Sequence, residues 1–374
     1  MKPIHITFVT HGSFDTHATL KRATGMAAPL LDAGHKVTIL MENSAVNREK
    51  ILQECPEVSV FWHPSKLSKF EERKLKQNVL KKLQPDLVWI CGLGFRNWMF
   101  RPKQDSVMLA DHSELFSSMD LGFLRKAFSW IIEWLHLLSF DAHVCASRYL
   151  EKFYKYRLNL FGKKDKVYYS PYAYHPKMMF TDVIGANKLL RQWRDRRPIV
   201  YVGSFWKNYG FWDMLHAFKY LKEKREDFVA VFLGSGPEKE KGMDWIKTNG
   251  LEDVIHIEGY VAEADLPAYF TAAYTFLSPL QDTIQDRARC PSKLFMYLPY
   301  RKPIVTCSVG EAKELFGSVG NYFEPGNVNS LTDTLERVLN SKNCLDLVVP
   351  EKHTYVTRVN DFLNWYKDNA DGRC

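Results

Sequence analysis

The sequence predicts an α/β protein with two doubly wound, Rossmann-like domains that face a cleft. Short apolar runs of strand length alternate with helical patterns along the chain, which is typical of parallel sheets covered by helices on both faces. A polar, arginine-rich segment, Thr181–Arg197, divides these runs into two groups. At 374 residues, the chain is also too long for one ordinary core and fits two domains.

Strands are expected where β-branched and aromatic residues cluster. In the first domain, residues 1–178, these runs are 4–9, 36–41, 58–62, 87–91, 106–110, 143–146 and 167–170. In the second domain, residues 198–350, they are 199–203, 229–234, 254–259, 274–278, 304–307 and 320–323. Residues 179–197 are the expected linker. Residues 351–374 hold a helix with one apolar face, which either returns to the first domain or packs on its own domain.

Composition and charge exclude several classes of protein. The net charge of +8 favours polyanionic ligands or an anionic membrane surface, and without a base-reading motif we expect no nucleic acid partner. Seven cysteines without a CxxC pair indicate reduced thiols and no metal site. The N-terminus lacks a signal-peptide pattern, and no apolar run is long enough to span a bilayer. We therefore expect a cytoplasmic protein, with localisation at the inner face of the membrane as the alternative.

The sequence allows two interpretations for the location of each of two helical segments. Residues 66–84 form a basic helix with an apolar stripe from Phe70 to Leu83. The stripe favours a surface helix packed through it, with contact to anionic lipid as the alternative. Residues 121–140 are rich in Phe, Trp and Leu but interrupted by charged residues. This pattern favours a buried crossover helix, with a membrane-facing or lipid-acceptor surface as the alternative.

Polar groups follow two strands of the first domain. Gly12 lies in the first strand–helix turn and would allow a ligand to approach the backbone, although a plain turn glycine explains it equally well. His112 follows the run 106–110 and can accept a proton from an attacking hydroxyl near neutral pH. Asp111 or Glu114 can orient its ring or bind an acceptor hydroxyl. A structural role for His112 is the alternative.

Glycine turns end three successive strands of the second domain. The turns are Gly203-Ser204, Gly234-Ser235-Gly236 and Gly259-Tyr260-Val261, and the cations near the expected crevice are Lys207, Arg287, Arg289 and Lys293. Backbone amides at helix starts, together with cations, bind phosphate groups well. We therefore expect a nucleoside-diphosphate site at this edge of the second sheet.

The second domain resembles the C-terminal half of retaining glycosyltransferases of the GT-B fold, family 4 (group 1). The resemblance follows the order strand-GS, strand-GSGPE, strand-EGYV and PSKLFMYLPYRKPIVT, and covers nearly the whole domain. The first domain matches more loosely, through AGHKVTIL, DHSE and CASRYLEKF. The resemblance implies GT-B architecture, a nucleotide-sugar co-substrate on the second domain, an acceptor on the first, and transfer in the cleft without metal or cofactor.

The resemblance also implies roles for single residues. On the donor side, Gly203 and Ser204 lie next to the phosphates, Gly234 and Gly236 form the second glycine turn, and Tyr260 and Val261 contact the base. Lys293 is the lysine of the P-x-K motif, and Asp282 or Asp286 is the carboxylate next to the sugar. His112 is the histidine of the acceptor half. Three departures weaken the match. Ser204 and Tyr209 replace the usual diphosphate-binding Arg and Lys, so Lys207 and Arg289 would substitute. Met296 replaces the ribose-binding glutamate, which should weaken nucleotide binding by about 1–3 kcal/mol if no other group takes its place.

The sequence therefore predicts a hexosyltransferase-like enzyme that moves a sugar from a nucleotide-diphosphate donor to a hydroxyl acceptor. By the resemblance, the acceptor is a glycan or glycolipid, as in surface polysaccharide assembly, and the configuration is retained. The alternative is a catalytically silent binding or scaffold subunit of a glycosyltransferase complex. Met296, Ser204 and Tyr209 favour that alternative, because each removes a group that the family uses on the nucleotide.

Overall fold

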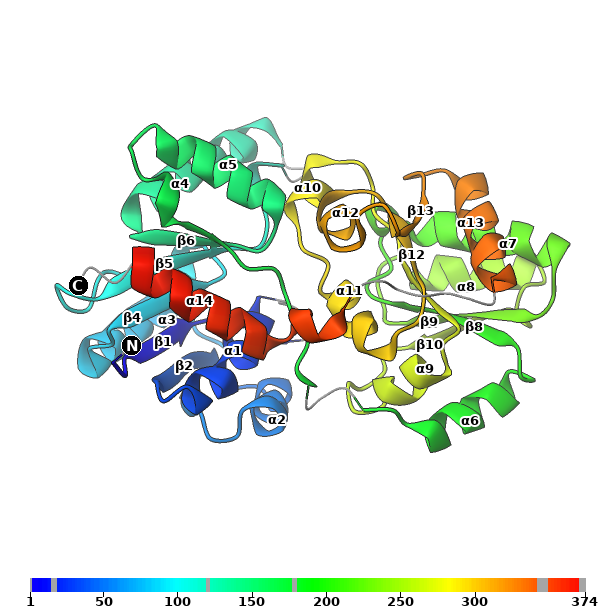
Figure 1. Ribbon diagram of the computed structural model, residues 1–374, viewed down its shortest axis with the longest axis horizontal. Coiled ribbons are helices and arrows are strands. Elements are labelled where there is room, and N and C mark those ends of the chain that lie inside the picture. Colours follow the sequence, from blue (N-terminus) through cyan, green and yellow to red (C-terminus); the bar gives the residue numbers. More distant parts are fainter. Residues whose placement is uncertain (1, 15–18, 119–121, 177–179, 342–348, 370–374) are drawn as a thin grey trace. The chain divides into compact units, whose positions relative to one another are not determined.

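The computed structural model describes residues 2–14, 19–118, 122–176, 180–341 and 349–369. The chain divides into two compact units. Unit 1 comprises Met1–Met178, Arg287–Cys290 and Lys352–Cys374, and unit 2 comprises Met179–Asp286 and Pro291–Glu351. In each unit a parallel sheet is covered by helices (Figure 1).

Unit 1 is built on a seven-stranded sheet in the order β3-β2-β1-β4-β5-β6-β7, with every neighbouring pair parallel. Its strands are β1 His5–Val9, β2 Lys36–Glu42, β3 Ser59–His63, β4 Leu87–Cys91, β5 Val107–His112, β6 Ala142–Cys145 and β7 Val167–Tyr169. Its helices are α1 Leu20–Asp32, α2 Ala45–Glu54, α3 Lys69–Leu83, α4 Phe123–Ser139, α5 Arg148–Asn159 and α14 Tyr355–Asn369. The strand order reverses between β1 and β4, which creates a topological switch point.

Unit 2 is built on a six-stranded parallel sheet in the order β10-β9-β8-β11-β12-β13. Its strands are β8 Arg197–Val202, β9 Phe228–Leu233, β10 Ile255–Gly259, β11 Thr275–Ser278, β12 Ile304–Cys307 and β13 Asn321–Phe323. Its helices are α6 Val183–Gln192, α7 Phe211–Lys224, α8 Lys239–Thr248, α9 Leu266–Ala272, α11 Ser292–Tyr297, α12 Gly310–Phe316 and α13 Val328–Asn340, while α10 Ile284–Ala288 runs across the division between the units. The switch point of this sheet lies between β8 and β11.

Every strand expected from the sequence is present, with ends shifted by at most two residues. Strands such as β4 and β9 are buried along their whole length, so their sequences are continuous apolar runs that can be recognised directly. The predicted fold class, two doubly wound α/β domains, is confirmed. The segment expected to be a linker contains α6, and β8 already begins at Arg197.

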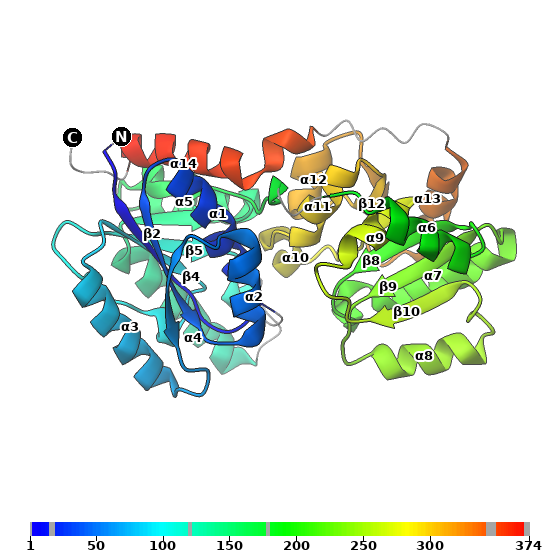
Figure 2. The same cartoon turned by 90° about the horizontal axis from the view of Figure 1, so that it is seen from below.

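The C-terminal helix α14 completes the core of unit 1. Its Phe362 ring packs 4.6 Å, centroid to centroid, from the buried Trp89 of β4. Figure 2 shows α14 beside α1, where Gly25 faces Tyr355. A Cβ atom on Gly25 would lie 2.2 Å from the Tyr355 ring, so only glycine permits this approach of the two helices.

The helices α3 and α4 differ from the sequence expectations. A capping box of Ser68 and Glu71 starts α3. Its predicted apolar stripe packs inward at Val79 and Leu83, whereas Phe70 is exposed and Lys76 is buried. The residues that α3 buries are Glu72, Lys76, Val79 and Leu80. The expectation of a buried crossover helix over 121–140 is wrong. The helix α4 does connect β5 to β6, yet its buried residues are Glu133, His136 and Leu137.

Within the described part of the chain, no helix is both long and apolar enough to cross a bilayer. The same residues contain no group of three or more His, Cys, Asp or Glu side chains placed to hold a metal ion. The described cysteines, Cys55, Cys91, Cys145, Cys290 and Cys307, are buried and form no disulfide. Cys344 and Cys374 lie outside the described residues.

Candidate functional site

The sheet of unit 2 brings the expected glycine turns together at its carboxyl edge. The loops after β10, β9, β8 and β11 are neighbours there in that order, because the strands are parallel neighbours. The turns are also hydrogen-bonded to one another. The Gly203 amide donates to the Leu233 carbonyl (2.9 Å), and the Gly234 amide donates to the Gly259 carbonyl (2.6 Å). The three turns therefore form one continuous backbone surface.

The glycines of the second turn are required by this packing. A Cβ atom on Gly234 would lie 2.0 Å from the Gly203 carbonyl oxygen, and one on Gly236 would lie 2.5 Å from the Phe205 amide nitrogen. Gly234 also has a φ of +142°, which L side chains rarely adopt. Both residues are glycine because one turn lies directly on the next, whatever ligand is bound outside them.

Gly203 has a different neighbour. A Cβ atom on it would lie 2.7 Å from the Lys293 ammonium nitrogen, which reaches the turn from the first residues of α11. That ammonium group also lies 4.1 Å from the ring centroid of Tyr201, which is buried in β8. The absence of a side chain on Gly203 thus makes room for Lys293 at the switch point, where ligands of doubly wound sheets bind.

The other expected donor-side residues are placed as follows. Ser204 and Lys207 are exposed in the loop after β8, Tyr260 is exposed and Val261 is half-buried after β10, and Arg289 lies in the segment Arg287–Cys290. That segment belongs to unit 1, where the Ser147 hydroxyl donates to the Ala288 carbonyl (2.5 Å). The structure therefore brings Gly203 and Lys293 together within unit 2, and the roles of the remaining residues stay predictions.

The two expected sugar-side carboxylates lie in the loop after β11 and differ in environment. Asp282 is exposed. Asp286 is buried, and its Oδ2 atom accepts a hydrogen bond of 2.6 Å from the Gln281 amide. Asp286 thus closes the turn of its own loop, and its assignment as a catalytic group stays a prediction.

In unit 1, Asp111 is part of the folded core. Its Oδ2 atom pairs with the Arg22 Nε atom at 2.8 Å and accepts a hydrogen bond of 3.1 Å from the Trp89 indole. Arg22 also donates to the Ser170 hydroxyl (2.9 Å) and is itself buried. The pair joins α1 to β5, so the structure gives Asp111 a role in stability. Glu114, in the turn beyond β5, is half-buried.

His112, the expected catalytic base, is buried at the end of β5. Its Nε2 atom lies 2.9 Å from His143 Nδ1, and the Tyr154 ring lies 3.9 Å from its own ring, centroid to centroid. Burial, and then the neighbouring His143, lowers the pKa of His112 well below the usual value. The ring is 2 % exposed, so this structure gives it no access to a substrate hydroxyl. Its catalytic assignment stays a prediction without support from the geometry.

A cavity of about 550 Å³ opens at the switch point of unit 1. It is lined by the loops that follow β1 and β4 and by the first turns of α3. The lining residues are His11, Gly12, Ser13, Glu42, Ser65, Lys69, Glu72, Gly92, Leu93, Gly94, Phe95, Arg96 and Asn97. A pocket of this size is typical of small-molecule sites, and of the expected acceptor-side residues it contains Gly12.

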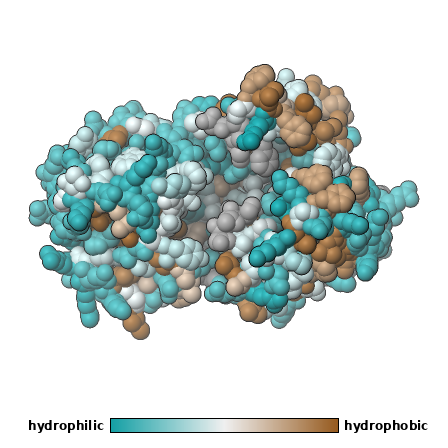
Figure 3. Space-filling model, turned by 180° about the vertical axis from the view of Figure 1, so that it is seen from behind, coloured by the Kyte–Doolittle hydropathy of each residue, from teal (hydrophilic) through white to brown (hydrophobic). Residues whose placement is uncertain are grey.

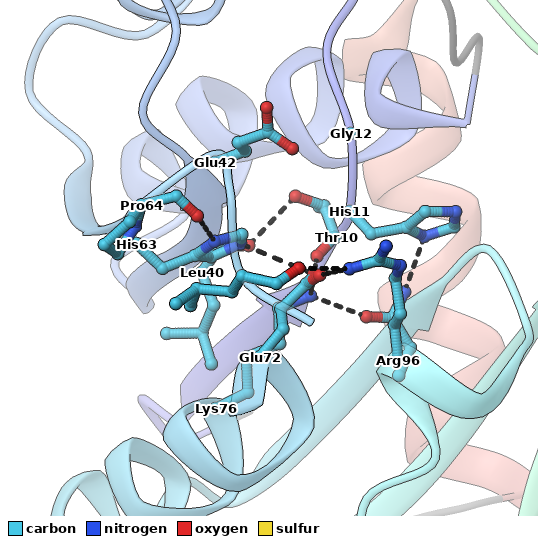
Figure 4. A network of polar contacts seen from close by, with 12 residues as sticks. Thr10, His11, Gly12, Leu40, Glu42, His63, Pro64, Glu72, Lys76 and Arg96 are labelled. Atoms are coloured by element: carbon cyan, nitrogen blue, oxygen red, sulfur yellow. Dashed lines mark hydrogen bonds and ion pairs between the residues drawn. The ribbon is translucent and has the colours of Figure 1, made fainter. Parts of the chain in front are cut away.

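A buried ion network forms one wall of this cavity (Figure 4). Glu72 pairs with Lys76 and Arg96, and the Lys76 ammonium group also donates to the Thr10 carbonyl at 2.6 Å. Burial lowers the pKa of Lys76 to about 8, although Glu72 acts in the opposite direction. Burial alone raises the pKa of Glu72, but Lys76 and Arg96 outweigh it, so the pKa lies below its usual value. The wall therefore keeps its charges paired at neutral pH.

The network also fixes His11 at the cavity. Lys76 can only donate, so the Asn97 Oδ1 atom, 2.9 Å away, accepts from it. The Asn97 amide nitrogen must then donate to its neighbours, which include His11 Nδ1 at 2.9 Å. In the neutral ring, the proton consequently lies on Nε2.

The sequence reasoning missed His11, Arg96 and Lys76. For His11 a signal was available, because it precedes Gly12 in the first strand–helix turn. For Lys76 and Arg96 there was none, since a basic residue on a basic helix or loop normally faces solvent.

Comparison with known proteins agrees with the architecture. Residues 196–341 match the model of a family described as "Glycosyl transferases group 1". This segment begins just before β8 and ends after α13, so it contains the whole sheet of unit 2. The resemblance seen in the sequence is confirmed for these residues at the level of group 1 glycosyl transferases, and the assignment to family 4 stays a prediction. No curated protein sequence matches the chain.

Solved structures match over the full length. A glycosyltransferase from Rickettsia africae matches with a TM-score of 0.73 and 14% identity, covering 100% of both chains. Anabaena HepE in complex with UDP and glucose matches with a TM-score of 0.74 and 14% identity, covering 98% of this chain and all of the other. Sucrose-phosphate synthase from Thermosynechococcus elongatus matches with a TM-score of 0.71 and 15% identity, over 97% and 96% of the chains. At these identities the likeness shows the fold: the chain has the two-domain GT-B architecture.

Proposed function

We propose that this protein is a glycosyltransferase that moves a sugar from a nucleotide-diphosphate donor to a hydroxyl acceptor in the cytoplasm. The observation that carries the proposal is that the family match covers the whole unit 2 sheet and includes the switch point at which Lys293 meets the Gly203 turn. The proposal includes retention of configuration and independence of metal, both of which follow from the family resemblance.

The donor diphosphate is proposed to bind outside the turn after β8. The Lys293 ammonium group beside Gly203 would neutralise a phosphate oxygen, and the backbone amides at the start of α7, which has no side-chain cap, would add hydrogen bonds. Glycosyl transfer needs such stabilisation because negative charge develops on the diphosphate as it leaves. Lys207, exposed in the same loop, would supply a second cation. HepE has been solved with UDP and with UDP-glucose, so uridine nucleotides are the first donors to test.

The acceptor is proposed to bind in the cavity of unit 1. Its lining includes the charged side chains of Arg96 and Lys69, which can donate to hydroxyl or phosphate oxygens, and of Glu42, which can accept from a hydroxyl. His11 is fixed there by Asn97. Such a lining fits a sugar hydroxyl acceptor better than an apolar molecule. A glycan or a lipid-linked sugar is the proposed acceptor class, as expected for surface polysaccharide assembly.

The donor site is tested by thermal unfolding of the full chain with UDP, GDP, ADP and CDP. A nucleotide that binds only the folded state stabilises it by about 2.7 kcal/mol at a concentration of 100 Kd, which raises Tm. We expect one nucleotide to raise Tm, Lys293→Ala to lose the rise, and Lys313→Ala, at an exposed position of α12, to keep it.

Two results would decide against the proposal. If no nucleotide raises Tm, the scaffold alternative is favoured, in line with Met296 at the place of a ribose-binding carboxylate. If the rise survives Lys293→Ala, the donor site lies elsewhere. Release of sugar from the selected donor, with and without a chelator, then tests metal independence. NMR of the transferred product tests retention.

A further inference from the structure

The helix α4 of unit 1 turns its apolar side chains outward. Phe123 and Leu124 are 84% and 81% exposed, among the highest values for large apolar residues in the described chain. The exposed apolar side chains of α4 are Phe123, Leu124, Phe128, Trp130, Ile131, Leu135 and Leu138. Figure 3, which views the molecule from behind, shows hydrophobic side chains gathered over the position of α4. Isolated exposed apolar residues are ordinary, but a contiguous face of them marks a contact surface.

The inner face of α4 is polar and specifically bonded. Glu133 accepts hydrogen bonds from the Ser117 amide and hydroxyl, both at 2.9 Å, and lies 3.6 Å from Arg157. His136 packs edge-on against Trp98 at 5.3 Å between ring centroids. A rotation of the helix that buried its apolar face would break these contacts and expose a buried ion pair to water. The outward apolar face is therefore fixed by the packing of the inner one.

The apolar surface continues beyond the helix. Trp134 of α4 contacts Phe161 edge-on, at 6.4 Å between ring centroids. Phe161 and its neighbour Leu160 are both exposed, and Lys163 and Lys164 follow them on the surface. We call the exposed residues of α4 together with Leu160–Lys164 the α4 surface.

The exposed charges of the α4 surface are predominantly positive. They are Arg125 and Lys126 on the helix and Lys163 and Lys164 beyond it, and the exposed Asp165 follows them in the chain. The acidic residue of the helix, Glu133, is turned inward to Arg157. Aromatic and leucine side chains on one face, bordered by cations, characterise helices that lie in the plane of an anionic bilayer. A protein interface would instead have few charged residues at its centre and both signs at its rim.

We propose that the α4 surface binds an anionic phospholipid bilayer, with Phe123, Leu124 and Phe128 entering the acyl boundary and the four cations contacting headgroups. Each cation near an anionic surface contributes about 1 kcal/mol, or roughly fivefold in affinity, so apolar burial and charge act together. Lipid-linked molecules would be within reach of a protein held in this way. The inference does not depend on the proposed transferase activity.

The test is flotation of the full chain with vesicles of phosphatidylcholine, alone or mixed with phosphatidylglycerol. We expect the protein to float with the mixed vesicles and at least about tenfold less with phosphatidylcholine alone, where none of the four cations has an anionic headgroup to contact. Phe123→Glu with Leu124→Glu should abolish flotation. The matched control, Val183→Glu with Ile184→Glu, changes two neighbouring exposed apolar residues on α6 and should float like the original chain.

A second pair of variants separates charge from apolar burial. Arg125→Glu with Lys126→Glu should reduce flotation by roughly tenfold or more, whereas Lys81→Glu with Lys82→Glu, an exposed pair at the end of α3, should change it little. Retained flotation of Phe123→Glu with Leu124→Glu overturns the inference, as does failure of the original chain to float. A dimer in sedimentation that this double variant dissolves, with no vesicle binding, would assign the face to a second copy. Because no nucleotide is present, these outcomes are independent of the donor-site test.

Discussion

The ammonium nitrogen of Lys293 lies 4.1 Å from the ring centroid of Tyr201, in the space that Gly203 leaves by having no side chain. The Tyr201 hydroxyl also donates to the Ser204 carbonyl at 3.1 Å. One buried ring thus positions both the lysine and the turn after β8. A cation placed over an aromatic ring is stabilised by about 0.5–2 kcal/mol, so the lysine is preorganised at the switch point of unit 2.

Substitution of the two turn glycines should separate binding from stability. Gly203→Ala puts a Cβ atom 2.7 Å from the Lys293 ammonium group, which is the end of a flexible side chain and can move, and 2.9 Å from the hydroxyl of the buried Tyr201 ring. We expect a moderate loss of unfolding free energy, about 1–3 kcal/mol from the φ of +151°, and loss of the nucleotide-dependent rise in Tm. Urea unfolding and melting curves measure the two effects.

Gly234→Ala is the contrasting variant. Its Cβ atom would meet the Gly203 carbonyl oxygen at 2.0 Å, and backbone cannot move aside without disturbing the sheet edge. We expect a larger loss of unfolding free energy than for Gly203→Ala. A Gly203→Ala protein with a full nucleotide response would contradict the role assigned to the Lys293 position.

Asp111→Asn should lower the unfolding free energy of the protein without changing its ligand binding. It leaves the buried Arg22 guanidinium without its carboxylate, and breaking a buried pair costs about 3–5 kcal/mol. Adding Arg22→Met should recover part of the loss, because no unpaired charge then stays buried. Asp165→Asn, at an exposed position of unit 1, is the control. An Asp111→Asn protein of normal stability that fails to use acceptor would restore the acceptor-side role expected from the sequence.

Acid should destabilise the protein through its buried histidines. Burial lowers the pKa of His136 and of His143 from 6.5 to about 4. Between these values the unfolded chain binds a proton on each ring that the folded chain does not, so the unfolding free energy falls as the pH falls. The slope is up to about 1.4 kcal/mol per pH unit for each histidine, and these rings add no slope above pH 6.5.

Urea unfolding as a function of pH measures this slope. His136→Gln should reduce this slope by up to the contribution of one proton, about 1.4 kcal/mol per pH unit. Equal slopes in the original chain and the His136→Gln variant would show that His136 is not held neutral by the fold.

Gly25→Ala should loosen the C-terminal helix. Its Cβ atom would lie 2.2 Å from the Tyr355 ring, so α1 and α14 must move apart. Overpacking of this kind costs about 1–3 kcal/mol, and limited proteolysis should then cut near α14. Gly122→Ala is the control, since a Cβ atom there has no described neighbour within 4 Å. If Tyr355→Ala in the same chain does not lessen the effect of Gly25→Ala, the contact is not its cause.

The strands could be predicted because their burial is symmetrical. A strand such as β9 is covered on both faces, so every position is apolar and the run itself is the signal. Helices do not give a signal at every position in this way, because only one face of a helix is buried. In α3 and α4 the buried faces carry the ion pairs Lys76–Glu72 and Glu133–Arg157, and a pattern of polar residues does not reveal that their charges are paired inside the fold. Periodicity identifies the apolar face of a helix, but only packing decides which face is buried.

The candidate site in unit 1 shows how a small error in a strand end changes a functional assignment. The sequence predicted a strand ending at Ala110, which would have put His112 in an exposed loop. In the structure β5 continues through His112, and the residue stays inside the sheet layer. His11 lies beyond the end of β1 instead and lines the cavity. In unit 2 the residues Gly203 and Lys293 were identified, whereas the supporting ring of Tyr201 was not, because an aromatic residue in a strand is ordinarily core.

The place of α14 in unit 1 determines when that unit can finish folding during synthesis. Trp89 and Gly25 emerge early from the ribosome, but Tyr355 and Phe362, which pack against them, are made after all of unit 2. The first unit to be translated is therefore the last to be completed. We expect a chain that terminates before α14 to leave Trp89 without its Phe362 neighbour, and the apolar surface exposed in this way should make such a nascent product a substrate for chaperones and proteases.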